Sequence, residues 1–389
     1  MIPQAVTARK PGAVFICIST LHVLNAIEVR HHWRIPEDQC VLIVLPRIGG
    51  GQADLSAAIE LVKWNRVIRL QADPVYDHAA PIRERLLQAW RLGRAIQHWQ
   101  MHIKPFRGCH TLCFPHLNKI AIKRMLAWLR PQHLILIDDG TLSMRLLNSV
   151  SGFPEYDPIT EFAEFHQLPV DGQALRRRFI FSLFGALNVW HGLLVNGLHA
   201  RRYTLFSTFA EAAPLGVASV RNTYAWLKER SARRGKSDAT VHFLGAPLVE
   251  RDGVTWEQYS GWLRMVRDAY RPYRFVYYLH PVESDAFGQR ISELLSCEVR
   301  REVLPYEAVF ALSERRPRVV VSWFCSALEN ILVLSDKVPR VEAFRIPRSE
   351  QTDTATFRSA RDFYRRYKNS KAIKLRSLSG VAWTRRVSG

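Results

Sequence analysis

The chain has 389 residues, of which 48% are hydrophobic, and its 55 Lys and Arg against 35 Asp and Glu give a net charge of +20. This composition excludes a disordered chain, and the length is enough for two domains of ordinary size. The charge predicts attraction to polyanions, which include nucleic acid, anionic lipid headgroups, nucleotides and acidic glycans.

No targeting or membrane-spanning segment is expected from the sequence. Residues 179–198 form the most apolar long stretch, but its Ser, Asn, His and Gly residues make it too polar for a transmembrane helix. The first residues lack a basic region followed by an apolar one, so no secretory signal is predicted. The six cysteines are scattered without a CxxC pair, which disfavours a zinc site and indicates a reduced, cytoplasmic protein.

Short apolar runs alternate with helical spacing of apolar residues in the first half of the chain. The predicted strands are residues 13–18, 41–45, 67–70, 111–114, 134–138 and 203–207. The predicted helices are residues 21–33, 53–64, 81–100, 118–129 and part of 175–198. Strands that alternate with helices indicate a parallel sheet that is covered on both faces.

The small and charged segment 231–237 predicts a linker, after which the same pattern starts again. The second set of predicted strands is 241–245, 274–279, 297–303, 319–322 and 340–344. Its predicted helices are 256–269, 287–295, 306–313 and 327–334. The expected organisation is therefore one α/β domain at 1–235, a second at 236–345 and a basic tail with a terminal helix at 346–389.

Two of the predicted strands end in residues that can move protons. The strand 134–138 ends in Asp138 and is followed by Asp139 and Gly140, and the glycine allows a sharp turn. The strand 274–279 is followed by His280 and Pro281. Ligands of open α/β sheets bind at the carboxyl ends of the strands, so both places are candidate sites. An acidic turn without function is the alternative interpretation of the first.

These residues suit transfer from a nucleotide-activated donor. A carboxylate can act as the general base on an acceptor hydroxyl, and a histidine can neutralise or protonate a phosphate leaving group. Glu307 begins a predicted helix and could hold a ribose diol, while Ser326 opens another helix and could bind a phosphate. Taken singly, Glu307 is better explained as a first-turn acid and Ser326 as an N-cap, and it is their shared placement at strand ends or helix starts after a His-Pro that makes them informative.

The set of motifs resembles a known family. Asp138-Asp139-Gly140, His280-Pro281 and the serine element at 322–326 are similar to the three short motifs of bacterial sialyltransferases, which are an acidic pair before glycine, a His-Pro and a paired serine. The hydroxyls at 19–20 and the segment 304–307 also resemble that group. The order and rough spacing of the motifs span nearly the whole chain, and their specificity comes from the set.

The resemblance implies a GT-B fold, in which two Rossmann-like domains face a central cleft. It implies an acceptor-binding N-terminal domain, a CMP-sugar-binding C-terminal domain, and inverting transfer from CMP-sialic acid to a glycan without metal or cofactor. It also implies that Asp139 is the base, that His280 meets the CMP phosphate, that Glu307 meets the ribose and that Ser326 meets the phosphate.

The remaining implied site residues have supporting roles. Asp138, Gly140 and Thr141 would support the base, and Pro281 would belong to the donor site. Cys325 stands where the first serine of the pair would be, so Ser322 is the candidate that supplies the missing hydroxyl.

Several alternatives stay open. Capsule polysialyltransferases and lipooligosaccharide sialyltransferases share these motifs, and a transferase of another CMP-sugar such as CMP-Kdo would look the same. The expected partners are a CMP-sugar and an acidic or lipid-linked glycan, with peripheral association to the inner face of a bacterial inner membrane. A basic nucleic-acid-binding protein is the alternative of another class, and the lack of an RRM, KH or zinc module speaks against it.

Overall fold

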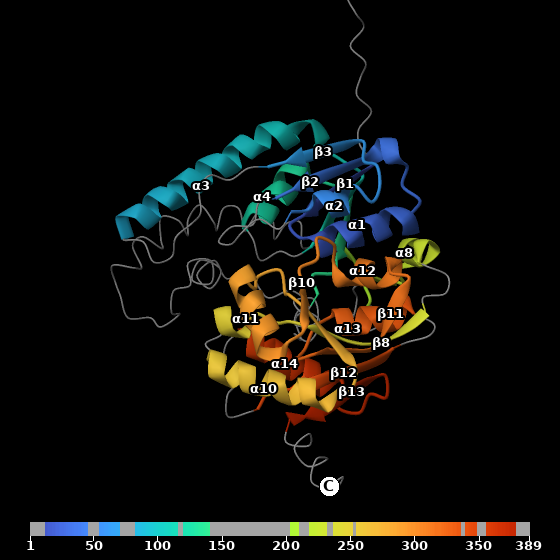
Figure 1. The fold of residues 1–389 in the computed structure, drawn as a ribbon. Helices are drawn as coiled ribbons and strands as arrows, with labels where there is room; N and C mark the ends of the chain where they lie inside the picture. The colour runs from blue at the N-terminus through green and yellow to red at the C-terminus, as the bar shows by residue number, and fades with distance from the viewer. Residues whose placement is uncertain are drawn as a thin grey trace, which may run out of the picture. The chain divides into compact units, whose positions relative to one another are not determined.

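The structure is a computed structural model, and it divides into two compact units. It describes residues 12–45, 54–70, 82–115, 120–140, 203–209, 218–231, 236–251, 254–335, 339–347 and 355–378. The first unit holds the chain up to Asp139 and residues 149–221, and the second holds residues 140–148 and the chain from Asn222 (Figure 1). Thr141 and the predicted helix at 175–198 lie outside the described residues.

The first unit is built on a seven-stranded sheet with the order β3-β2-β1-β4-β5-β6-β7, in which every pair is parallel. Its strands are β1 (Ala13–Cys17), β2 (Cys40–Val44), β3 (Arg66–Arg69), β4 (Thr111–Phe114), β5 (His133–Ile137), β6 (Tyr203–Ser207) and β7 (Ala218–Arg221). Its helices include α1 (Thr20–His32), α2 (Ser56–Ile59), the long α3 (Ile82–Ile103) and α4 (Ile120–Leu129). The central strands β1 and β2 are buried along their whole length, as a parallel sheet with covered faces requires.

The second unit contains a six-stranded parallel sheet with the order β10-β9-β8-β11-β12-β13. Its strands are β8 (Lys236–Leu244), β9 (Arg274–Tyr278), β10 (Glu298–Arg300), β11 (Arg315–Ser322), β12 (Arg340–Arg345) and β13 (Ile373–Ser377). Its helices are α8 (Ala225–Arg230), α9 (Leu248–Arg251), α10 (Trp256–Ala269), α11 (Asp285–Leu295), α12 (Tyr306–Leu312), α13 (Ala327–Leu334) and α14 (Ala355–Arg366). Helix α10 contacts α11, and α12 contacts α13.

The division between the units lies upstream of the segment that the sequence predicts as a linker. Helix α8 precedes Ser231 and belongs to the second unit, where it contacts α12. The Arg316 guanidinium donates a hydrogen bond to Ser231 Oγ over 2.7 Å, so the start of the predicted linker is packed on the second unit.

The basic tail is likewise part of the second unit. Strand β13 extends the sheet by pairing with β12, and the hydroxyl of Tyr364 in α14 donates to the carbonyl of Phe344 in β12 over 3.1 Å. Helix α14 also buries one face, which includes Phe357, Ala360 and Phe363. Residues 355–378 are therefore a structural element of this domain.

In both sheets, the direction in which successive strands are added reverses at one point. The chain builds outward from β1 to β3 and then returns to place β4 on the other side of β1, and it repeats this order from β8 to β11. At such a switch point, the loops after the two adjacent strands separate and leave a crevice at their carboxyl ends. The switch points are thus at β1 and β4 in the first unit and at β8 and β11 in the second.

Candidate active site

In the first unit, the carboxyl ends of β5 and β1 bring an aspartate and a histidine together. Asp139 Oδ1 lies 2.5 Å from His22 Nε2, although 117 positions separate the two residues in the chain. His22 stands in the first turn of α1, whose N-cap Ser19 accepts a hydrogen bond from the His22 backbone N–H. The chain then turns at Gly140, which adopts a φ of 67° that favours glycine.

The protonation pattern of His22 follows from its second contact. The backbone N–H of Ile18 donates to His22 Nδ1 over 3.2 Å, so this nitrogen carries no proton. The proton of the neutral ring is therefore on Nε2 and is donated to Asp139. The His22 side chain is 3% exposed and the Asp139 side chain 23%, so the carboxylate is the more accessible member of the pair.

Asp138 has a different environment from its neighbour. Its carboxylate is buried and accepts hydrogen bonds from the hydroxyls of Ser207 (2.9 Å) and Thr208 (3.4 Å), at the end of the adjacent strand β6. Its backbone carbonyl accepts from Asn25 Nδ2 of α1 over 2.9 Å. Asp138 thus ties β5 to β6 and to α1, while Asp139 is held by His22.

In the second unit, the His-Pro segment after β9 is held by a buried carboxyl group. Glu283 Oε2 accepts the backbone N–H of His280 over 2.7 Å, and Glu283 Oε1 accepts the Tyr277 hydroxyl over 2.8 Å. The Val282 N–H donates to His280 Nδ1 over 3.2 Å, which places the proton of the neutral His280 ring on Nε2. Pro281 is exposed within this turn.

Burial raises the pKa of Glu283 to about 7, because desolvation outweighs the hydrogen bonds from His280 and Tyr277 that favour the carboxylate. The Tyr277 hydroxyl lies 2.7 Å from that of Tyr259, and burial raises the pKa of both phenols. The Glu283 carboxyl is thus the group of this buried network whose charge changes near neutral pH.

Ser322 links the two strands of the switch point. Its buried hydroxyl donates to the carbonyl of Leu244 over 2.9 Å, which joins the ends of β11 and β8. Gly245 follows at once, and a Cβ at that position would lie 2.4 Å from Glu283 Oε2. The candidate donor residues His280 and Ser322 are therefore connected through Glu283 and Gly245 along one edge of the sheet.

Gly245 must be a glycine for a steric reason. Besides the Glu283 oxygen, an added Cβ would lie 2.6 Å from the Tyr277 hydroxyl, and both neighbours are buried. We expect Gly245→Ala to lower the free energy of unfolding by about 1–3 kcal/mol, as overpacking does elsewhere. Gly261 of α10 has no heavy atom within 4 Å of an added Cβ, so Gly261→Ala should instead stabilise by up to about 1 kcal/mol. Denaturant unfolding of the two variants measures both effects, and equal effects of the two substitutions would contradict this packing.

The two other predicted donor residues start helices at the same end of the second sheet. Glu307 is buried in the first turn of α12, and its Oε1 accepts from Asn330 Nδ2 of α13 over 2.7 Å. Ser326 is the N-cap residue of α13, but its side chain makes no capping hydrogen bond. Burial raises the pKa of the Cys325 thiol to about 11, so this residue is a neutral thiol at neutral pH.

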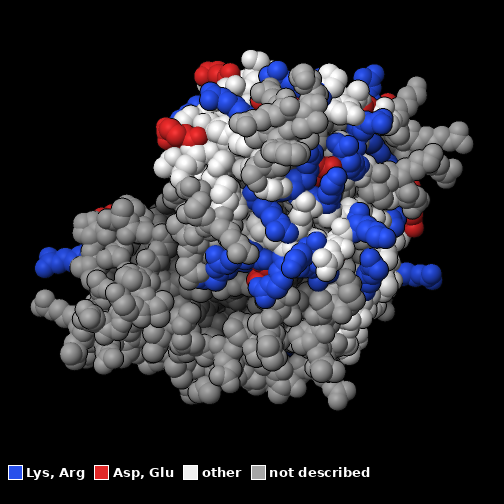
Figure 2. Space-filling model, turned by 90° about the horizontal axis from the view of Figure 1, so that it is seen from below, with Lys and Arg blue, Asp and Glu red and all other residues white. Residues whose placement is uncertain are grey.

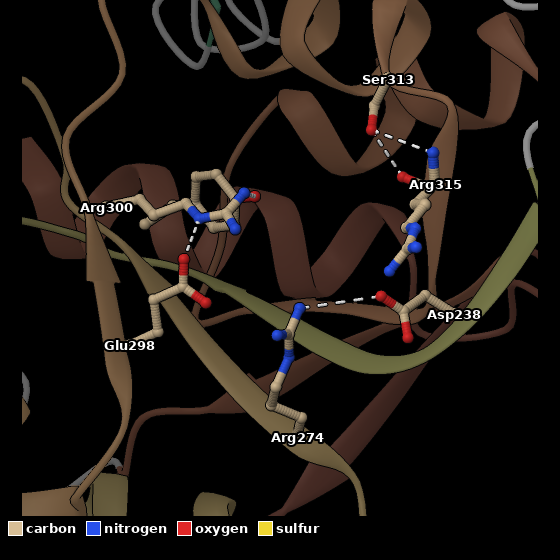
Figure 3. A network of polar contacts seen from close by, with 7 residues as sticks. Asp238, Arg274, Glu298, Arg300, Ser313 and Arg315 are labelled. Atoms are coloured by element: carbon tan, nitrogen blue, oxygen red, sulfur yellow. Dashed lines mark hydrogen bonds and ion pairs between the residues drawn. The ribbon is translucent and has the colours of Figure 1, made fainter.

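A further polar cluster occupies β8, β9 and β10 (Figure 3). Arg300 pairs with Glu298 over 2.6 Å and donates to the Tyr278 hydroxyl over 3.2 Å, and Arg274 lies 3.7 Å from Asp238. Both ion pairs are partly exposed, and such pairs contribute only about 0–1 kcal/mol to stability. This cluster therefore adds little to the stability of the sheet.

Among the residues that the structure describes, no group of three or more His, Cys, Asp or Glu side chains could hold a metal ion. Within the same part of the chain, no helix combines the length and the apolar character that a membrane span needs.

The structure brings the predicted residues together as two groups. Asp138, Asp139 and Gly140 lie at the end of β5, whereas His280, Pro281, Glu307, Ser322 and Ser326 lie at strand ends and helix starts of the second unit. Sequence reasoning missed His22 and Glu283. His22 lies four residues from Ile18 at the start of a helix, next to the Ser19 and Thr20 hydroxyls, and this position was the signal that could have identified it.

Comparisons with known proteins show the fold. No protein-family model matches the chain, and no curated protein sequence matches it. A Listeria monocytogenes structure assigned as a UDP-N-acetylglucosamine 2-epimerase is similar with a TM-score of 0.52 and 12% identity, over 97% of this chain and 87% of that one. The GT-B domain of a sialyltransferase from Photobacterium damselae has a TM-score of 0.39 and 12% identity, over 94% of this chain and 100% of that one. MurG from Acinetobacter baumannii has a TM-score of 0.41 and 10% identity, over 95% of this chain and 86% of that one.

The strand orders and the similarity to the Listeria monocytogenes structure indicate the same architecture. Each unit has a parallel, doubly wound sheet with a switch point, and the similarity to the epimerase spans both units. The chain therefore has a GT-B fold with two Rossmann-like domains, as the sequence predicted.

Proposed function

We propose that the protein is an inverting, metal-independent glycosyltransferase that moves sialic acid from CMP-sialic acid to a glycan acceptor. The observation that carries the proposal is the Asp139 carboxylate at the carboxyl end of β5, partly exposed and held by His22. A fixed carboxylate with access to solvent is what a general base on an acceptor hydroxyl requires. The GT-B fold and the motif set that resembles bacterial sialyltransferases support the same reaction.

In the proposed reaction, Asp139 is the base and CMP is the leaving group. Asp139 takes the proton of the acceptor hydroxyl while the oxygen forms a bond to the anomeric carbon of sialic acid. The bond from that carbon to the phosphate oxygen of CMP breaks, and CMP leaves with the electron pair. Attack opposite to the leaving group inverts the anomeric configuration.

The second domain supplies the donor contacts in this proposal. His280, with its proton on Nε2, donates to the departing phosphate, and Pro281 shapes the turn that carries it. Ser326 and the start of α13 meet the phosphate, and Glu307, oriented by Asn330, meets the ribose. The Ser322 hydroxyl hydrogen is already donated to Leu244, so Ser322 contributes by shaping this edge of the sheet.

The charge distribution supports an acidic partner. From α14 to the end of β13, the exposed Lys and Arg residues are Arg361, Arg365, Lys368, Lys371 and Lys374. On the face shown in Figure 2, Lys and Arg side chains predominate over Asp and Glu. Such a surface attracts anionic donors, acidic or lipid-linked glycans and the anionic inner face of a bacterial membrane.

CMP alone should stabilise the protein, because the donor contacts that we propose recognise its ribose and phosphate. A ligand that binds only the native state adds about 2.7 kcal/mol to stability at a hundredfold excess over Kd. Thermal unfolding with and without CMP measures this effect, and His280→Ala should reduce it. The Listeria monocytogenes structure with a similar fold is assigned as a UDP-N-acetylglucosamine 2-epimerase, so UMP and UDP are informative controls. A shift with the uridine nucleotides and none with CMP would contradict the proposed donor, although not the fold.

A further inference from the structure

We infer that His22 is the positioning residue of the base, acting on the reaction through Asp139 and not through contact with substrate. This inference rests on the proposed function. It names a residue outside all of the motifs in which the resemblance lies, and it is carried by the geometry at the start of α1.

The imidazole of His22 is held from both sides. Its Nδ1 accepts the Ile18 N–H over 3.2 Å, and its Nε2 donates to Asp139 Oδ1 over 2.5 Å. The ring is 3% exposed, and its backbone N–H is bonded to the N-cap Ser19. The Ile18 N–H at the end of β1 thus keeps the proton off Nδ1 of His22. The neutral ring therefore carries its proton on Nε2, and this N–H points at the Asp139 carboxylate.

This arrangement decides which member of the pair accepts the proton. A proton on His22 Nδ1 would have to replace the hydrogen bond from Ile18 and would leave two donors facing each other in a buried place. The Asp139 carboxylate is more exposed and can accept a proton without disturbing β1. His22 therefore fixes one oxygen of Asp139, and this fixes the direction in which the carboxylate faces its substrate.

Removal of the imidazole should lower kcat and leave the affinity for the donor unchanged. A misplacement of a catalytic group by about 1 Å can cost about 10²-fold in rate, so we expect His22→Ala to lower kcat by about that factor while the Kd for CMP stays the same. His22→Gln, which keeps a side-chain donor, should recover part of the loss. His32→Ala is the matched control, because His32 is exposed at the other end of the same helix.

A double variant separates positioning from a purely structural role. If His22 acts through Asp139, His22→Ala should cost nothing further in kcat once Asp139→Asn has removed the base. A structural role predicts that the two losses multiply. Multiplying losses, or a His22→Ala variant with wild-type kcat, would overturn the inference.

A measurement that does not depend on activity tests the pairing itself. Imidazole ¹⁵N NMR should show His22 as the neutral tautomer protonated at Nε2, and Asp139→Ala should shift its Nε2–H resonance upfield. Signals assigned by comparison with His22→Gln identify the residue. An Nδ1-protonated His22 would overturn the inference. The expected spectrum in a protein that transfers no sugar would contradict the proposed function while the pairing stands.

Discussion

Asp139→Asn should lower kcat by about 10²–10⁴-fold, the usual contribution of a general base. Asparagine keeps the shape of the side chain and can still accept the His22 N–H, but it cannot take a proton from the acceptor hydroxyl. The Kd for CMP should stay nearly unchanged, because the donor contacts belong to other residues. Steady-state kinetics with calorimetric CMP titration measures both quantities.

Asp138→Asn is the matched control for this experiment. Asp138 is buried and its Oδ2 accepts both the Ser207 and the Thr208 hydroxyl, so an amide oxygen in that place would keep both hydrogen bonds as weaker, uncharged ones. We expect a loss of about 1–3 kcal/mol in stability, with a smaller change in kcat. Near-full turnover of Asp139→Asn together with an inactive but folded Asp138→Asn would show that the two roles are reversed.

The second large effect concerns the pH dependence of stability through Glu283. Its pKa is raised from 4.5 to about 7 in the folded protein, so the native state binds a proton that the unfolded state releases between these values. Glu283 therefore stabilises the fold fully below about pH 4.5, and this contribution is lost as the pH rises through about 7. A difference of about 2.5 pKa units corresponds to about 3 kcal/mol.

Glu283→Gln removes this pH dependence. The glutamine retains an oxygen that accepts the His280 N–H, and its NH₂ group can donate to the Tyr277 hydroxyl oxygen. The unfolding free energy of the wild type minus that of the variant should fall by most of about 3 kcal/mol from about pH 4.5 to about pH 7.5. Urea unfolding at several pH values measures it, and Glu293→Gln on the exposed side of α11 is the surface control. Parallel curves for wild type and Glu283→Gln would contradict a protonated, buried Glu283.

Most of the fold could be predicted because buried parallel strands are continuous apolar runs. The strand β4 and the helices α10 and α13 lie at the predicted positions. The strands β7 and β13 were missed because polar and charged residues interrupt their short apolar pattern, and both lie at sheet edges. In β13, Lys374 and Arg376 alternate with apolar residues, as edge strands often do, and this hid the strand within a basic tail.

Less of the site could be predicted, for a physical reason. The place of Asp139 follows from one strand and its turn, which are local in sequence. The contact of Asp139 with His22 depends on β1 and β5 lying on either side of β4, and no local pattern carries that order. Glu283 stands two residues after Pro281 in a short turn, and it is buried against Gly245, which follows β8, and Tyr277 of β9.

Release of CMP from CMP-sialic acid tests the central claim most directly. The wild-type protein should release CMP at the same rate with and without EDTA, faster when a glycan acceptor is present, and Asp139→Asn should release it at least about 10²-fold more slowly. The proposal would be contradicted if the protein released no CMP from CMP-sialic acid or CMP-Kdo while it consumed UDP-N-acetylglucosamine or shifted RNA in a salt-dependent gel assay.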